Sequence, residues 1–164
     1  MAKPKRAAPP PSRAKPKTQM DVEHAFKRRD WNGDWMWRLR ELCLSFPEAV
    51  EVEQFGGPWY KAGGVKGKAF CLYGADSEKV GNGYRGRDGA GFNMTLMDQA
   101  ALLEDPRFER PHYIGQHGWV TMRWDRAPDW AEVRDLVASA YRKVANKRML
   151  KALDEAASAP RPPT

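Results

Sequence analysis

The sequence has few of the residues from which metal centres and disulfide frameworks are built. Its 164 residues include two cysteines, Cys43 and Cys71, and three histidines. Each cysteine lies inside an apolar run, and their spacing fits neither a zinc site nor a disulfide framework, so both are expected to be buried thiols. The histidines are too scattered for a metal centre, and no Ser/His/Asp or Cys/His arrangement indicates catalysis. We therefore expect no metal, no cofactor and no enzymatic activity.

Long apolar runs are also missing. No stretch approaches the roughly 18 apolar residues that cross a bilayer, and the first residues contain no apolar segment of the signal-peptide kind. The sequence therefore predicts no membrane partner and a location in the cytoplasm. With 164 residues, of which 41% are hydrophobic, the chain fits one domain with an ordinary core.

Acidic residues are absent from the first twenty positions, and the positive charge is unevenly distributed. The net charge is +7, of which residues 1–20 carry +6 and the chain after Tyr141 carries +4, which leaves −3 for residues 21–141. Such ends favour polyanionic partners. An affinity for nucleic acid is therefore expected to begin with the N-terminal tail, whose cations are Lys3, Lys5, Arg6, Arg13, Lys15 and Lys17.

Proline-rich segments flank the expected domain. Residues 1–20 combine proline, alanine and basic residues with too little apolar surface to fold, and residues 156–164 repeat that composition. Both are expected to be disordered tails, with one domain between residues 30 and 150.

The domain pattern predicts helices and short strands in alternation. A helix is expected from an N-cap at Asp34 to Pro47, then antiparallel strands over residues 50–73, a strand at 92–96, a short helix ending at Asp105 and a strand at 119–124. The last helix begins at Asp129, which forms a capping-box pair with Glu132. This is an α+β domain in which helices pack on one face of an antiparallel sheet.

Two glycine-rich segments are similar to phosphate-binding loops. Residues 81–86 have the spacing of a dinucleotide-binding loop, but no helix follows, so residues 74–91 are expected to be a long exposed connection or a hairpin tip. Residues 63–68 resemble a P-loop without its first glycine, because Ala62 stands there. They are interpreted as a hairpin turn whose Lys66 and Lys68 can contact phosphate.

The order of these segments resembles the YjbR (MmcQ-like) family from about Leu39 to Lys147. The residues that carry the resemblance are CLSFPEA (43–49), FGGPWY (55–60), KAFC (68–71), YIG (113–115), HGWV (117–120), DW (129–130) and SAYR (139–142). The resemblance implies a CyaY-like α+β fold and a DNA-binding protein. The glycine-rich connection and the basic tail are additions to the family pattern.

The hypothesis is a non-enzymatic, DNA-binding protein that contacts the phosphate backbone without sequence preference. The alternative is a module that binds a protein or a small ligand through the glycine loop and the aromatic edge around Tyr113 to Trp119. Besides the tail, the nucleic-acid-binding residues are expected to be Lys66 and Lys68 of the turn, Arg85 and Arg87 of the glycine-rich connection, His117 before the aromatic strand, and Lys147 and Arg148 at the basic end of the last helix.

Overall fold

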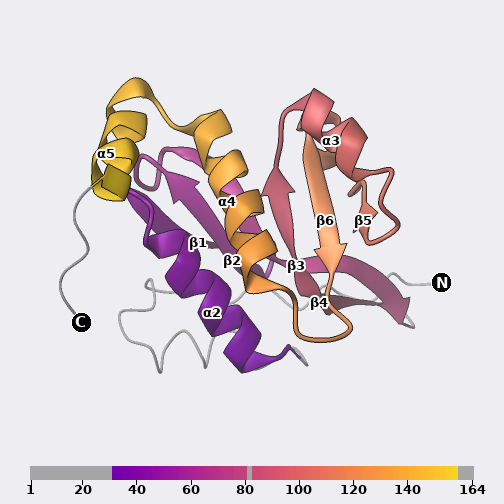
Figure 1. Ribbon diagram of the computed structural model, residues 1–164. Coiled ribbons are helices and arrows are strands. Elements are labelled where there is room, and N and C mark those ends of the chain that lie inside the picture. Colours follow the sequence, from indigo (N-terminus) through magenta and orange to yellow (C-terminus); the bar gives the residue numbers. More distant parts are fainter. Residues whose placement is uncertain (1–30, 81–82, 159–164) are drawn as a thin grey trace.

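The computed structural model describes residues 31–80 and 83–158 (Figure 1). The basic tail at residues 1–20 therefore lies outside the described residues. The strands are β1 (Ala49–Gln54), β2 (Gly57–Ala62), β3 (Lys68–Val80), β4 (Gly83–Asn93), β5 (Phe108–Glu109) and β6 (Trp119–Arg123). The helices are α2 (Gly33–Leu44), α3 (Leu96–Leu102), α4 (Trp130–Val144) and α5 (Lys147–Ser158), with a 3-10 helix η1 (Ile114–His117).

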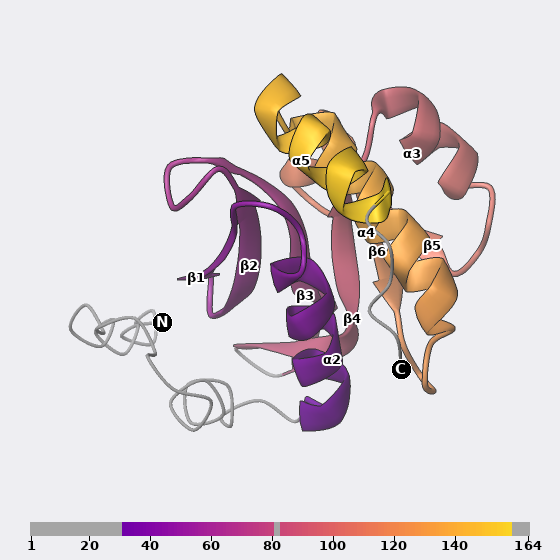
Figure 2. The ribbon, with the colours of Figure 1, turned by 60° about the vertical axis from the view of Figure 1, so that its left-hand side comes forward.

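The strands form one antiparallel sheet in the order β1-β2-β3-β4-β6-β5. Helices α2 and α4 lie side by side on one face of this sheet, as Figures 1 and 2 show. The expected α+β class, with helices packed on one face, is confirmed.

The core lies between α2, α4 and the sheet. The apolar stripe of α4 is buried, together with one face of α2 and alternate residues of the central strands. Tyr141 is fully buried, and its hydroxyl donates to the carbonyl oxygen of Pro47 at 2.7 Å, which ties α4 to the loop after α2. Cys43 and Cys71 are free, buried thiols, as expected, and burial raises the pKa of Cys43 well above its usual value.

Helix α2 begins earlier than predicted. Its N-cap is Asn32 rather than Asp34, because the Asn32 side chain accepts a hydrogen bond from the Trp35 N–H at 3.1 Å. Asp34 lies within the first turn, where its charge is favourable to the helix dipole.

The glycine-rich segment at residues 74–91 consists mainly of strand rather than of open connection. Strand β3 extends to Val80 and β4 starts at Gly83, so the two form a long hairpin. Ala75 pairs with Arg87 and Glu78 with Arg85, and the register between the two strands shifts at two places. The hairpin was expected as one of two alternatives, but the strand content was missed because glycine weakens the alternating pattern.

The C-terminal part of the chain contains one helix that the sequence pattern did not predict. The N-cap of α4 is Asp129, as predicted, whereas Glu132 bonds to Arg107 instead of returning to the cap. Helix α5 then extends to Ser158, so residues 156–158, expected in the disordered C-terminal tail, are helical. The Asn146 side chain caps α5 at the Met149 N–H, and Met149 is buried. Within the described residues, no helix is long and apolar enough to cross a membrane.

Candidate nucleic-acid interface

One end of the sheet is assembled around the ammonium group of Lys143, in the last turn of α4. This group donates hydrogen bonds to the carbonyl oxygens of Met94 and His117, at 2.6 and 2.7 Å, and to the Asn93 side chain. Gly118 has a φ of +103°, and a Cβ there would stand 2.0 Å from the Met94 oxygen, so the approach requires glycine. The contacts join α4, the end of β4 and the start of β6.

The acceptors around Lys143 are neutral, so its positive charge is not cancelled. Burial lowers the pKa of Lys143, and the nearby charge of Lys68 lowers it further. Lys68 is the first residue of β3, so the turn between β2 and β3 lies close to the end of α4. Lys68 of the predicted turn is thus coupled electrostatically to the end of α4, whereas Lys147 and Arg148, predicted at the basic end of that helix, begin α5 instead.

The β2–β3 turn is held against the start of α5. The N–H groups of Gly63 and Gly64 donate to the carbonyl oxygen of Glu48 at 3.0 and 3.3 Å, and the Met149 side chain lies against Gly63. At Gly67 a Cβ would come within 1.9 Å of the Ala62 oxygen, so this tight turn needs glycine. The turn therefore presents its lysines from a fixed backbone.

Several cations at this end have no acidic partner. Lys66, Lys68 and Lys147 are exposed, and none of them takes part in an ion pair within the described residues. Unpaired exposed lysines of this kind are the side chains that neutralise phosphates and release counterions. We call the surface formed by these three lysines and Lys143 the basic end.

Two arginines beside the basic end are already paired. Arg148 forms a two-pronged ion pair with Glu48, at 2.8 and 3.0 Å, and Arg142 bonds to Asp154 at 3.0 Å. Arg148, a predicted phosphate contact, is therefore partly neutralised by a residue 100 positions earlier. His117, another predicted contact, also lies at this end; its backbone oxygen accepts a hydrogen bond from Lys143, and the residue is exposed.

The structure separates the remaining predicted contacts from the basic end. Arg85 and Arg87 lie on β4 opposite the far half of β3, whereas Lys68 begins β3. Arg87 pairs with Ala75 and Arg85 with Glu78, 7 and 10 residues after Lys68, which corresponds to about 23 and 33 Å along the strand at roughly 3.3 Å per residue. The predicted tail cations lie outside the described residues.

Sequence reasoning missed the polar side chains that build this end. Lys143 and Glu48 are not among the residues that the sequence predicts to bind nucleic acid. Gln99 is buried and donates to the carbonyl oxygens of Gly115 and Trp119, at 2.6 and 2.9 Å, which fixes α3 against η1 and β6. The one available signal was the SAYR motif, which directly precedes Lys143.

The described part of the chain offers no metal centre. No three His, Cys, Asp or Glu side chains within residues 31–80 and 83–158 come together in a way that could hold a metal ion.

Comparisons with known proteins agree with this architecture. A crystal structure of a Deinococcus radiodurans protein with a DUF419 domain matches with a TM-score of 0.50 and 17% identity, over 71% of this chain and 85% of that one. A Pseudomonas syringae protein matches with a TM-score of 0.47 and 14% identity, over 59% and 87%. The first likeness concerns the fold alone, and the second is too weak to support an argument.

No curated protein matches the chain. The model of the YjbR family matches residues 44–143, which is more than half of the sequence and nearly the range over which the motifs resemble that family. The matched range contains all six strands of the sheet, the β2–β3 turn and, at its last position, Lys143. The protein therefore belongs to the YjbR family.

Proposed function

We propose that this protein is a non-enzymatic DNA-binding protein that contacts the phosphate backbone of duplex DNA without sequence preference. The observation that carries the proposal is that Lys66, Lys68 and Lys147 are exposed, without acidic partners among the described residues, at the end of the sheet where the Lys143 ammonium is held by neutral oxygens. The domain has little net charge, but this end concentrates positive charge on one surface. Phosphate contacts of this kind give affinity and orientation without reading the bases.

The basic tail supplies the larger share of the electrostatic affinity in this proposal. If about five of its six charges each release a counterion, the logarithm of the binding constant falls with the logarithm of salt concentration with a slope of about −4 to −5. Deleting residues 1–17 is expected to flatten that slope. Each phosphate that the basic end neutralises then makes this slope steeper by about a further 0.9.

Charge-neutral variants of the full-length chain test the role of the domain. Lys66→Gln with Lys68→Gln is expected to reduce the salt slope on duplex DNA by about 2. The matched control is Arg126→Gln with Arg134→Gln, which removes the same charge from exposed positions beside the β6–α4 connection at the opposite end of the molecule (Figure 1). If the two double variants have equal salt slopes, Lys66 and Lys68 do not contact DNA, and binding is attributed to the tail.

One observation favours a second candidate, a module that binds a protein or a small ligand. Tyr113 is 92% exposed and has φ +64° and ψ −62°, in a γ-turn closed by the Ile114 N–H and the His112 oxygen at 2.7 Å. Such a turn is strained, and strain at an exposed aromatic residue is a reason to suspect a binding role. Trp119, expected in the same edge, is buried and not available for contact.

A ligand screen separates this candidate from DNA binding. A compound that raises the melting temperature of the wild-type protein but not of Tyr113→Ala would support a ligand site at this turn. Tyr113→Ala is not expected to change the affinity for duplex DNA, because Tyr113 is not among the cations of the basic end.

A further inference from the structure

The face of the sheet opposite α2 and α4 is apolar in its centre. The register places Val52, Trp59, Leu72, Gly91 and Thr121 in one row across five strands. The neighbouring row consists of Tyr60, Cys71, Phe92 and Val120, all fully buried in the core beneath the helices. Since successive side chains in a strand point to opposite faces, the Trp59 row faces away from the helices. We call this the open face.

In strand β1 the apolar and polar side chains lie on the opposite faces from those expected for a sheet with one solvated face. Val50 and Val52 point to the open face, while Glu51 points to the helix side, where it pairs with Arg40 of α2 at 3.2 Å. An antiparallel sheet with one wet face normally places its polar residues on that face. The open face is therefore built for contact with something other than water.

Three aromatic rings lie in a row across the open face. The ring centroids of Phe55 and Trp59 are 5.7 Å apart, and those of Trp59 and Trp119 are 5.3 Å apart. Exposure increases along the row: Trp119 is buried, Trp59 is partly exposed, and Phe55 is 89% exposed. The row thus ends in a ring that is open to solvent.

Phe55 occupies a position that its side chain does not favour. It forms with Gly56 the two-residue turn between Gln54 and Gly57, and both turn residues have positive φ, +50° and +78°. Turns of this kind favour Asn-Gly, because a bulky residue with positive φ is strained. Because Phe55 is exposed, burial of its ring does not offset this backbone strain. A strained, exposed residue of this kind indicates a functional role.

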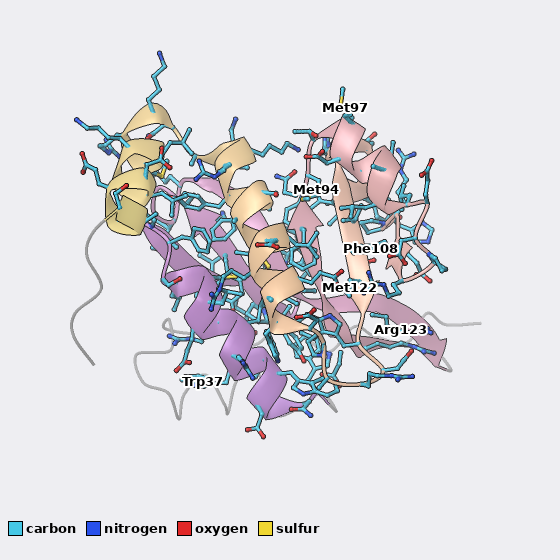
Figure 3. All side chains as sticks on the ribbon, in the orientation of Figure 1. Trp37, Met94, Met97, Phe108, Met122 and Arg123 are labelled. Atoms are coloured by element: carbon cyan, nitrogen blue, oxygen red, sulfur yellow. The ribbon has the colours of Figure 1, made fainter. Side chains whose placement is uncertain are left out.

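Charge on the open face favours an anionic partner. Lys61 follows Trp59 by two residues on β2, so it lies on the same face, and the next turn carries Lys66. Arg123 continues the face on β6 and pairs with the exposed Asp125 at 3.3 Å; Figure 3 shows it at the end of β6. Among the paired residues of β1, β2 and β6 that share this face there is no carboxylate; Glu109 of β5, at the far edge, is opposite Thr121.

We propose that the open face along β2 binds single-stranded DNA, with unpaired bases stacked on Phe55 and Trp59 and phosphates at Lys61 and Lys66. Aromatic rings accept any base, because every base has a π-face, and adjacent lysines follow the backbone. This goes beyond the proposed function, since it concerns the open face, which shares only Lys66 with the basic end, another ligand, and stacking rather than charge alone. It also does not require the basic end to bind duplex DNA.

The test measures binding of the full-length protein to a labelled oligothymidylate and, separately, to a duplex. Phe55→Asn is expected to weaken oligothymidylate binding about tenfold. The same variant is expected to raise the melting temperature, because asparagine suits the turn, and to leave duplex binding unchanged. A purely structural role for Phe55 would not move affinity and stability in opposite directions.

Two further variants complete the test. Tyr113→Asn removes another exposed aromatic residue with positive φ, which belongs to no strand and precedes η1, and it is expected to leave oligothymidylate binding unchanged. Lys61→Gln is expected to reduce the salt slope on the oligonucleotide by about 0.7. The inference is overturned if the wild-type protein does not bind oligothymidylate, if Phe55→Asn binds it as tightly as the wild type, or if Tyr113→Asn loses as much affinity. Duplex binding reports on the proposed function independently.

Discussion

The Nζ atom of Lys143 donates a hydrogen bond to the carbonyl oxygen of Met94 at 2.6 Å and so joins the end of α4 to the end of β4. We predict that Lys143→Met lowers the free energy of unfolding by about 2 kcal/mol, since it removes three hydrogen bonds and leaves the partly buried carbonyl oxygen of Met94 without its donor. Urea denaturation measures the change. Lys147→Met, at an exposed position without an ion pair in the described residues, is the control and is expected to change stability by less than about 0.5 kcal/mol. Equal effects would contradict a bracing role for Lys143.

The hydrogen bond from the Tyr141 hydroxyl to the Pro47 carbonyl oxygen is also expected to stabilise the fold. Tyr141→Phe keeps the buried ring and removes only the hydroxyl, so we expect a loss of about 1 kcal/mol. Tyr113→Phe, at a fully exposed ring, removes a hydroxyl that makes no hydrogen bond within the described residues and should be neutral. Thermal unfolding of both variants measures the difference, and an unchanged Tyr141→Phe would show that the bond adds nothing to the fold.

Arg107 links Asp105 to Glu132, with contacts of 2.8 Å to each, and it holds the pKa of Asp105 below its usual value through hydrogen bonds. Because the folded-state pKa is lowered, this interaction stabilises the fold above the ordinary aspartate pKa and is lost as the pH falls through the folded value. Carboxyl NMR titration should show a low pKa for Asp105 in the wild type and an ordinary one in Arg107→Gln. The same low pKa in both proteins would exclude Arg107 as the cause.

Breaking the ion pair between Glu48 and Arg148 is expected to give a variant that binds DNA more tightly. Glu48→Gln removes the carboxylate that neutralises Arg148 and adds one net positive charge at the basic end. We expect a several-fold higher affinity for duplex DNA and a salt slope that is steeper by about 0.9. Glu104→Gln makes the same change of charge at an exposed position after α3 and is the control. If both variants gain equally, net charge rather than the basic end explains the effect.

Local signals in the sequence predicted the elements that have clear periodicity or caps. The start of α4 at Asp129 was correct, because aspartate is a favoured N-cap whose side chain accepts a hydrogen bond from the first turn of the helix. The start of α2 was wrong by two residues, because Asn32 and Asp34 are both acceptable caps and only the folded chain selects one. Strand at residues 75–80 and 83–91 was missed because pairing across the hairpin overrides the weak preference of glycine.

The candidate sites depend on contacts between distant parts of the chain, which local patterns do not specify. Lys68 and Lys143 are brought together by the sheet and α4, and Arg148 meets Glu48 across 100 positions. The separation of Arg87 from Lys68 likewise follows from the length of β3. The open face became visible only when the register assigned Val52, Trp59 and Leu72 to one side of the sheet.

Amide NMR of the full-length protein, titrated with duplex DNA, shows residue by residue where the folded domain meets the duplex. We predict that the largest chemical-shift changes within the described residues fall on the β2–β3 turn around Lys66 and Lys68, and on the α4–α5 junction around Lys143 and Lys147. Residues beside Arg126 and Arg134, at the opposite end, should stay unchanged. Shift changes that avoid the basic end, or a spectrum in which no residue of the folded domain responds, would show that the domain does not bind DNA through the basic end.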